Sequence, residues 1–513
     1  MIIIYHNKSK VTEVVSTATG SFPNERSQDI SQVLFDLADK FRNEILVWCD
    51  ENERANLNLL EIESLFHHKK ILFSYTSSAN NYFDRRLGYV EDSPFININK
   101  KVQYGTWQMS SEVGAIHASA LNASKKSLKP ESNFDYFLNS FAKKAMPFGL
   151  LCYSEPKLLL ERKVTESKSK ADLYTLFRFT KQHYKTRWVF LLFADLLVFE
   201  KQFPLLPLVL SWFYRKRNFN PELLNQVPLQ SNKNLINQGT FDVLIPTIGR
   251  RDYLLDVLNN LESQTLLPKN VIIIEQNPDP NSKSDLDFIY NKKWSFNIKH
   301  QFIHQSGACN ARNIALELVE SEFTFFADDD IVFSNDLLEK TLRTFQNTGN
   351  EALLVACHLQ TQVINPEAPK QFAVFGTSHA FVKSSSFNDI KFNMGFEFGY
   401  GEDNDFGMQL RNKGVDIIYI STSQILHLKA PMGGFRTKPT VRWQDDLIQP
   451  KPSPTIMLFR LLHDTREQLL GYKTVLFIKS LNKNFFLNPV GYIKLFRKKW
   501  DKSIFWANEL NKQ

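Results

Sequence analysis

Apolar, strand-like runs alternate with amphipathic helical patterns from Phe241 onward, and this alternation limits the folds open to the chain. Residues 243–245 and 271–274 are fully apolar runs. Between them, leucines recur on one helical face, at Leu254, Leu255, Leu258 and Leu261. Continuous apolar strands joined by such helices are typical of a mostly parallel sheet covered on both faces. Ligands bind at the carboxyl ends of such strands, so the residues that follow each strand are the first candidates for a functional site.

The chain has 513 residues, which is more than one typical domain contains. The stretch 226–239 is rich in Asn, Gln and Ser, which predicts a linker. Beyond about residue 450 the apolar residues recur with helical spacing. We therefore expect an accessory α/β domain over residues 1–235, an α/β catalytic domain over 236–450 and an amphipathic helical region over 451–513.

Three consecutive aspartates, Asp328, Asp329 and Asp330, lie between the apolar runs 323–327 and 331–333. Adjacent carboxylates repel one another and are costly to bury. A divalent cation bound through hard oxygen ligands would offset this cost, with substrate phosphates completing its coordination. A solvated acidic turn that caps the next helix is the alternative. The buried flanks favour the metal site.

A second acidic pair, Glu402 and Asp403, follows the glycine-containing segment 399–401 and begins a predicted short helix. Acids favour helix N-termini, so capping is one explanation. A cap needs only one carboxylate, whereas two carboxylates behind a glycine loop indicate an active-site base. A helix N-terminus lowers the pKa of a carboxylate and weakens it as a base, which is tolerable when the proton moves late in bond formation.

Three further residues follow predicted strands or open a helix. His427 comes shortly after the apolar run 415–420 and, beside an acidic metal site, is a candidate imidazole ligand; alone, it would more often be a packed core histidine. Glu275 follows the second strand and could accept hydrogen bonds from a base or ribose. Arg312 lies in a helix that opens at Gly307, where it and the helix amides could meet a diphosphate.

The order of these features resembles the inverting family 2 glycosyltransferases, which have the Rossmann-like GT-A fold. The resemblance rests on the Pro246-Thr247 turn, an acid after the second strand, Ala311-Arg312-Asn313, the three aspartates, a Gly-Glu-Asp motif and a late histidine. The segment 396–427 is also similar to the carboxyl-terminal part of galactosyltransferase-type enzymes. Together these matches cover about residues 241–430.

The resemblance implies a nucleotide-sugar donor, expected to be a UDP-sugar, a saccharide or lipid-linked acceptor, and Mn²⁺ or Mg²⁺ as cofactor. It implies that Asp403 removes the acceptor proton and that Glu402 orients the acceptor. Donor contacts would come from Thr247, Glu275, Arg312, Asp328 and Asp329, and the metal ligands would be Asp330 and His427. The family usually has Asp where this chain has Glu275, which leaves the nucleobase open.

The first half of the chain is weakly similar to the second. Residues 105–120 resemble 376–386, and residues 134–155 resemble 396–421. The first half has no triple acid, and Asp50-Glu51 is only a faint acidic remnant. Two hypotheses stay open: a degenerate GT-A-like domain that binds acceptor or braces the enzyme, and an unrelated α/β accessory domain.

The net charge of +8 suits an anionic partner, but the basic residues form no stripe beside the acidic site, so nucleic acid is not expected. Residues 492–502 mix aromatic residues with five Lys/Arg, which predicts a membrane anchor in peripheral contact with an anionic membrane; a helical cap on the catalytic domain is the alternative. The longest apolar runs fall short of the roughly 20 residues that cross a bilayer. Widely spaced cysteines and no visible secretory signal predict a cytoplasmic protein, peripheral at the inner face of the cell membrane.

Two other functions remain open at this point. A non-catalytic scaffold subunit that binds nucleotide sugars would share the fold, but such proteins lose the base and metal ligands first, and this chain keeps both. A nucleotidyltransferase also joins acidic metal ligands to a nucleotide-binding sheet, but it would not need Glu402 and Asp403 beside an acceptor. Release of nucleoside diphosphate rather than pyrophosphate distinguishes sugar transfer from nucleotidyl transfer.

Overall fold

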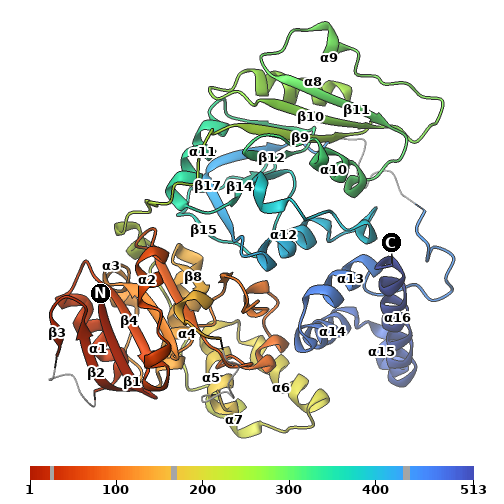
Figure 1. Ribbon diagram of the computed structural model, residues 1–513. Helices are drawn as coiled ribbons and strands as arrows, with labels where there is room; N and C mark the ends of the chain where they lie inside the picture. The colour runs from red at the N-terminus through yellow and green to blue at the C-terminus, as the bar shows by residue number, and fades with distance from the viewer. Residues whose placement is uncertain (23–27, 163–169, 431–439, 513) are drawn as a thin grey trace. The chain divides into compact units, whose positions relative to one another are not determined.

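The computed structural model describes residues 1–22, 28–162, 170–430 and 440–512 (Figure 1). Two compact units make up the chain: unit 1 is Met1–Asn232 with Asp464–Ile478, and unit 2 is Lys233–His463 with Lys479–Gln513. The division lies close to the expected boundary at residue 235. The region 451–513, expected as one helical part, is shared between the two units. Residues 431–439 of the expected catalytic domain lie outside the described residues.

Unit 2 is built on a mixed sheet with the order β11-β10-β9-β12-β16-β14-β17-β13. The strands are β9 (Phe241–Thr247), β10 (Asn270–Gln276), β11 (Asn297–Ile303), β12 (Phe323–Ala327), β13 (Ile331–Phe333), β14 (Ala352–His358), β15 (Lys370–Gln371), β16 (His379–Lys383) and β17 (Ile417–His427). Strands β11, β10, β9 and β12 are parallel, β16 runs antiparallel between β12 and β14, and β15 pairs with β17. The predicted α/β class with a helical carboxyl-terminal region is confirmed.

Helices flank this sheet, and aromatic packing fixes the helix that carries the second acidic pair. The helices are α8 (Arg251–Glu262), α9 (Phe288–Asn291), α10 (Ala308–Glu317), α11 (Leu337–Thr348), α12 (Glu402–Asn412), α13 (Pro454–His463), α15 (Lys483–Leu487) and α16 (Pro489–Leu510); α14 (Arg466–Ser480) crosses the division between the units. Phe406 of α12 packs against Phe326 of β12 and stacks on Phe392. This packing anchors the first turn of α12 beside the end of β12.

The carboxyl-terminal helix α13 braces the glycine loop before α12. Thr455 accepts a hydrogen bond from the Tyr400 amide at 3.1 Å, and a Cβ on Gly399 would lie 2.3 Å from a Thr455 methyl carbon. Gly401, with φ of +116°, forms the N-cap of α12 in a conformation that favours glycine. The glycines therefore let α13 approach the loop closely.

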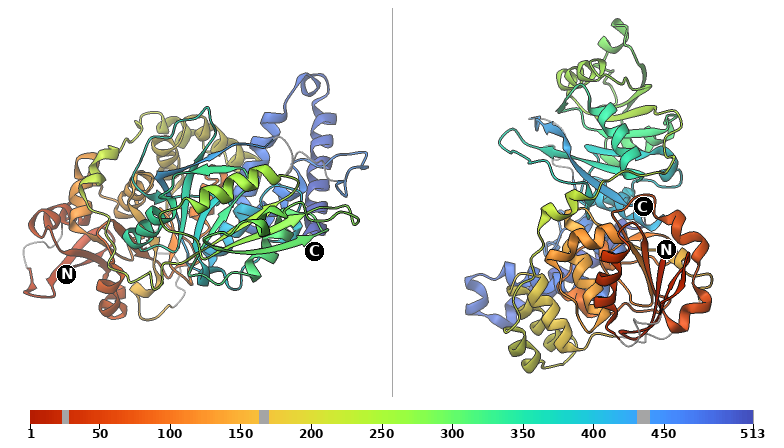
Figure 2. Two further views of the ribbon diagram at one scale, coloured as in Figure 1. Left: turned by 90° about the horizontal axis from the view of Figure 1, so that it is seen from above. Right: turned by 90° about the vertical axis from the view of Figure 1, so that its left-hand side faces the viewer.

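Unit 1 carries its own mixed sheet, with the order β3-β2-β1-β4-β7-β5-β8-β6 (Figures 1 and 2). The strands are β1 (Ile2–Asn7), β2 (Lys10–Ser16), β3 (Gly20–Ser21), β4 (Ile45–Asp50), β5 (Ile71–Tyr75), β6 (Tyr104–Gly105), β7 (Val113–His117) and β8 (Leu151–Ser154). The helices are α1 (Ile30–Lys40), α2 (Leu59–Leu65), α3 (Ala118–Ser124), α4 (Phe134–Ala145), α5 (Leu173–His183), α6 (Arg187–Phe199) and α7 (Leu205–Ser211). Large apolar side chains, among them Trp48 and Phe137, fill its core.

The two sheets share one topology. The spatial order β1-β4-β7-β5-β8-β6 matches β9-β12-β16-β14-β17-β15, and the six strands follow the same order along the chain. In both sets the pairs are parallel, antiparallel, antiparallel, parallel and antiparallel in turn. This agreement favours the hypothesis that unit 1 is a degenerate second copy over that of an unrelated α/β domain.

Each of the four cysteines, Cys49, Cys152, Cys309 and Cys357, has a free thiol. Within the described residues, no helix is both long enough and apolar enough to cross a membrane.

Candidate active site

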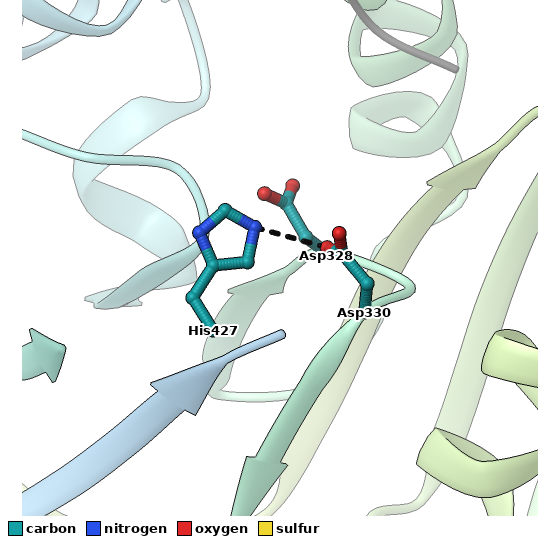
Figure 3. A group of neighbouring side chains, drawn as sticks. All are labelled: Asp328, Asp330 and His427. Atoms are coloured by element: carbon teal, nitrogen blue, oxygen red, sulfur yellow. Dashed lines mark hydrogen bonds and ion pairs between the residues drawn. The ribbon is translucent and has the colours of Figure 1, made fainter. Parts of the chain in front are cut away.

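The ends of β12 and β17 bring two aspartates and a histidine together (Figure 3). Because β13 pairs with β17 so that Ile331 lies opposite His427, Asp330 faces the histidine. His427 Nε2 is 3.1 Å from Asp330 Oδ1, and Asp330 Oδ2 accepts a hydrogen bond from the Ala430 amide at 2.8 Å. Asp328, Asp330 and His427 each offer one ligand atom, and these atoms lie within 4.8 Å of one another. The sequence placed Asp328 at the donor nucleotide, whereas the structure also groups it with the two expected metal ligands.

Asp329 is held by the protein and does not join this cluster. Thr247 Oγ1 donates to Asp329 Oδ2 at 2.6 Å, and Arg250 Nη1 lies 2.6 Å from Asp329 Oδ1. Asp329 therefore ties the acidic turn to the end of β9. The sequence placed Thr247 and Asp329 at the donor nucleotide, but here each satisfies the other, and their contact with a donor stays a prediction. Arg250 was missed because it lies beyond the recognised Pro-Thr turn.

Burial and neighbouring charges set the pKa values of the cluster. Burial raises the pKa of Asp328 to about 6, against the opposing charge of Arg312. Burial acts in the same direction on Asp330, but hydrogen bonds from His427 and the Ala430 amide outweigh it and lower the pKa. The hydrogen bond with Asp330 raises the pKa of His427. At pH 7 a carboxylate with a pKa near 6 is mostly ionised, and a bound cation would stabilise its buried negative charge, so the cluster is suited to metal binding.

The second acidic pair lies in the first turn of α12. Asp403 accepts hydrogen bonds from Thr377, from the hydroxyl at 2.6 Å and from the amide at 3.3 Å. Burial raises the pKa of Glu402 to about 7, with a further contribution from the charge of Asp403. Glu402, with a pKa near 7, and Asp403, which the hydrogen bonds from Thr377 orient, are both suited to proton transfer at neutral pH.

Arg312 connects the two acidic groups. Its guanidinium is buried, and Nη2 lies 3.4 Å from Asp328 Oδ1. Burial acts to lower the pKa of Arg312, but the charges of Asp403, Asp328 and Glu402 outweigh it and raise the pKa. The positive charge of Arg312 therefore acts on both acidic groups.

The amino end of α10 departs from expectation. The sequence predicted that its amides would meet a diphosphate, but the carboxylate of Glu397 accepts from the Cys309 amide at 3.1 Å and the Asn310 amide at 2.8 Å. Gly307, with φ of +144°, permits this cap, since a Cβ there would lie 2.3 Å from the Glu397 carboxyl carbon. An internal carboxylate thus holds the positive end of the helix.

Glu275 makes contacts within the domain. Its Oε2 lies 2.9 Å from His300 Nε2 and accepts from Ser284 Oγ at 2.5 Å, while Oε1 accepts from the Asp285 amide at 2.9 Å. Glu275 therefore holds the loop that follows β10. Its contact with a nucleoside stays a prediction.

A cavity of about 400 Å³ opens beside His427. Its lining includes His358, Gln362, Ser378, His379 and Tyr419. Burial lowers the pKa of His379 to about 4, so its imidazole is neutral at pH 7, and its Nδ1 lies 2.7 Å from Ser378 Oγ. The cavity thus offers hydroxyl, amide and imidazole groups, which suit sugar hydroxyls. Sequence patterns did not single out His379, because a lone histidine at a strand start carries no signal.

A protein-family model matches the part of the chain that contains most of this site. The model of the family described as glycosyl transferase family 2 matches residues 242–405, a span that includes the acidic turn, Arg312 and both acids of α12. Residues 242–405 form a family 2 glycosyltransferase domain. The resemblance predicted from the motifs is confirmed for this domain.

Curated relatives are similar to the chain over shorter spans. The minor teichoic acid biosynthesis protein GgaB of Bacillus subtilis (strain 168) is 23% identical over 177 residues, which cover 31% of this chain and 20% of GgaB. The poly(ribitol-phosphate) beta-N-acetylglucosaminyltransferase TarS of Staphylococcus aureus (strain Mu50) is 25% identical over 117 residues, 22% of this chain and 20% of TarS. The chain thus spans about a fifth of the length of these relatives. A solved structure of S. aureus TarS 1–349 with UDP-GlcNAc aligns at 18% identity and a TM-score of 0.37, covering 52% of this chain and 81% of that one.

Unit 1 has acidic residues at two positions equivalent to those of the glycosyltransferase domain's site, but the described residues of unit 1 do not include an equivalent set of metal ligands. Strand registers place Asp50 at the position of Asp328, because Cys49 lies opposite Val113 as Ala327 lies opposite His379. Asp135, in the first turn of α4, accepts from the Ser111 amide at 2.9 Å, as Asp403 does from Thr377. Strand β8 ends at Ser154, well before a position like that of His427. Of the described residues, only Asp328, Asp330 and His427 form a metal-ligand cluster.

Stability of the glycosyltransferase domain should depend on the protonation of Glu402. Because its pKa rises from 4.5 to about 7 on folding, its stabilising contribution is fully present below pH 4.5 and is lost as the pH rises through 7. Glu402→Gln should therefore unfold at a higher temperature than the wild type at pH 8, with a gain on the order of 1–3 kcal/mol. The gain should be smaller at pH 5. Thermal melts at both pH values measure it, and an equal effect at the two would contradict the assigned pKa.

Proposed function

We propose that the chain is an inverting, metal-dependent glycosyltransferase that moves a sugar from a nucleotide-sugar donor to a saccharide or lipid-linked acceptor in cell-surface polysaccharide synthesis. One observation carries the proposal: the cluster of Asp328, Asp330 and His427 shares Arg312 with Glu402 and Asp403. Sugar transfer needs a binding site for a diphosphate and a base for an acceptor hydroxyl, side by side. A scaffold subunit that only binds nucleotide sugars would not need the base.

The relatives point to the donor class. TarS is named as an N-acetylglucosaminyltransferase acting on poly(ribitol-phosphate), and GgaB is named for teichoic acid biosynthesis. We therefore expect a UDP-sugar donor carrying a hexosyl or N-acetylhexosaminyl group, and an acceptor that belongs to a surface polymer or its lipid-linked precursor.

The donor set of the cluster fits Mn²⁺ or Mg²⁺. Two carboxylate oxygens and one imidazole nitrogen lie within 4.8 Å of one another, and the imidazole favours Mn²⁺ of the two. When bound, the ion supplies Lewis-acid neutralisation of the departing diphosphate. Asp329 is already engaged by Thr247 and Arg250, so it would orient the acidic turn rather than ligate the ion.

The acceptor hydroxyl is activated from the opposite side. Asp403 takes its proton, the hydroxyl oxygen bonds to the anomeric carbon, and the bond from that carbon to the diphosphate oxygen breaks, so the configuration inverts. The two hydrogen bonds from Thr377 orient Asp403, and Glu402 binds the acceptor. Buried Arg312 stabilises the negative charge shared by the acids and the diphosphate.

The test is a screen of nucleotide sugars with Mn²⁺ present, with mass analysis of the products. Sugar transfer releases nucleoside diphosphate, and we expect this product to disappear when a chelator removes the metal. Release of pyrophosphate would indicate a nucleotidyltransferase instead. Tight donor binding with no product from any saccharide or lipid-linked acceptor would favour the scaffold subunit.

A further inference from the structure

Exposed apolar side chains concentrate at one part of unit 1. Of the thirty-one large apolar side chains exposed among the described residues, eleven lie between residues 190 and 214. This stretch comprises α6, α7 and the residues next to them, which lie together at the periphery of unit 1 (yellow in Figures 1 and 2). Isolated exposed apolar residues need no explanation, but a contiguous group marks an interaction site.

The two helices form one surface, named here the α6–α7 face. Val189, Leu192 and Leu196 of α6 point inward and are buried in the core of unit 1. The opposite sides of the helices carry the exposed group, which includes Phe203, Leu205, Leu206, Val209, Trp212 and Phe213. Trp212 meets Phe190 edge-on with ring centres 5.8 Å apart, so side chains of the two segments are in contact. The exposed apolar surface is therefore continuous across both helices.

Basic side chains surround this face. Residues 181–217 contain seven Lys/Arg and two acids, and one of those acids, Asp195, is buried. The exposed basic residues are Lys185 and Arg187 before the apolar stretch, Lys201 between its two helices, and Arg215 and Lys216 after it. An apolar centre with a cationic rim is complementary to a surface that has an apolar interior beneath an anionic outer layer.

We propose that the α6–α7 face binds an anionic phospholipid bilayer, with its apolar side chains below the headgroups and its basic rim among them. Helix α6 has 13 residues, too few to cross a bilayer, so it lies in the plane of the surface. Trp212 and Tyr214 are exposed and lie next to Arg215 and Lys216 along the chain, and aromatic residues of this kind favour the bilayer interface. The proposal does not depend on the reaction catalysed.

A second copy of the chain is a poorer occupant of the face. A symmetric dimer through it would set the two basic rims against each other, and like charges at an interface are repulsive. The carboxyl-terminal segment 492–502, expected to contact membrane, is also less suited, since its Phe496 and Trp500 are buried within unit 2. That burial favours the helical cap over the membrane anchor for this segment.

Vesicle sedimentation with the full chain tests the proposal. We expect binding to vesicles of phosphatidylcholine mixed with phosphatidylglycerol, weaker binding to pure phosphatidylcholine, and loss of binding as salt is added. Leu206→Ser with Phe213→Ser should weaken binding by about tenfold or more. Arg215→Glu with Lys216→Glu should do the same on the anionic vesicles only. Both pairs are exposed, and thermal melts check that the variants fold.

Two control variants make the result specific. Leu60→Ser removes an apolar side chain that is 92% exposed elsewhere in unit 1 and should bind as the wild type does. Phe486→Ser with Leu487→Ser removes exposed apolar residues of the carboxyl-terminal helices and should also bind normally. The proposal is overturned if the wild type ignores anionic vesicles or if the α6–α7 variants bind like the controls. A dimer in sedimentation velocity that these variants dissociate would instead assign the face to a second copy.

Discussion

Asp403→Asn should abolish sugar transfer while leaving donor binding almost unchanged. The amide keeps the size of the side chain and can still accept from the Thr377 hydroxyl, but it cannot take up a proton. Loss of a general base lowers kcat by about 10²–10⁴-fold. Product release measured with a saturating donor gives kcat, and calorimetric titration of the nucleotide sugar with Mn²⁺ gives the affinity.

Glu402→Gln is the matched control for this prediction. The two acids are adjacent in α12, and burial raises the pKa of Glu402 to about 7. If Asp403 is the base, Glu402→Gln should raise the KM for the acceptor more than it lowers kcat. If Glu402→Gln is inactive and Asp403→Asn retains activity, Glu402 is the base and Asp403 binds the acceptor. If Asp403→Asn lowers the donor affinity as much as it lowers sugar transfer, Asp403 is not the catalytic base.

Asp330→Ala should eliminate the metal-dependent part of donor binding. Asp330 contacts both His427 and the Ala430 amide, so its loss removes one ligand and frees the imidazole of another. We expect the affinity for the nucleoside diphosphate with Mn²⁺ to fall by about 100-fold or more, to the value measured with a chelator. Calorimetric titration with and without Mn²⁺ measures both values.

Asp336→Asn provides the control for metal binding. Asp336 is an acid near the same turn but pairs with Lys340 on the surface, so its variant should retain full metal dependence. Asp330→Ala must also melt like the wild type without metal, because a folding defect would mimic lost binding. An Asp330→Ala variant with unchanged Mn²⁺-dependent affinity would exclude this residue from the metal site.

The residues that follow strands could be identified from the sequence. Continuous apolar runs located β12 and the first part of β17, and parallel topology then predicted that Asp330 and His427 lie at one sheet edge, although His427 is the last residue of β17 rather than a residue after it. The pair Glu402 and Asp403 stood out because glycines precede it and a helical pattern follows. In each case a local pattern, read together with one topological rule, was sufficient.

Contacts between distant segments could not be predicted in this way. The Glu397 cap of α10 joins residues 88 positions apart, and the bonds from Asp329 to Thr247 and Arg250 depend on the register of β9 against β12. These contacts engage three expected donor-binding groups within the fold, namely the α10 amides, Thr247 and Asp329, and the contact of Thr247 and Asp329 with a donor stays a prediction. No local pattern distinguishes a polar group that faces a ligand from one that is satisfied within the fold.

The shared topology of the two units was visible in the sequence only as weak similarity. Strand pairing aligns residues 111–117 with 377–383, whereas sequence similarity alone set 105–120 against 376–386. The two alignments agree at the carboxyl end, where residue 120 corresponds to 386, and differ at the amino end, because side chains of the site, which carry the recognisable motifs, are replaced in unit 1. Asp50 and Asp135 occupy the positions of Asp328 and Asp403, but the glycine loop and the histidine are missing there.

Location of bound Mn²⁺ by anomalous diffraction, in crystals grown with Mn²⁺ and UDP, tests the central claim most directly. We expect a single ion between Asp328, Asp330 and His427, in contact with the diphosphate and on the same side of the sheet as Glu402 and Asp403. An anomalous peak at that position, absent in Asp330→Ala, is the expected result. UDP bound with the peak elsewhere, or with no peak at all, would contradict it.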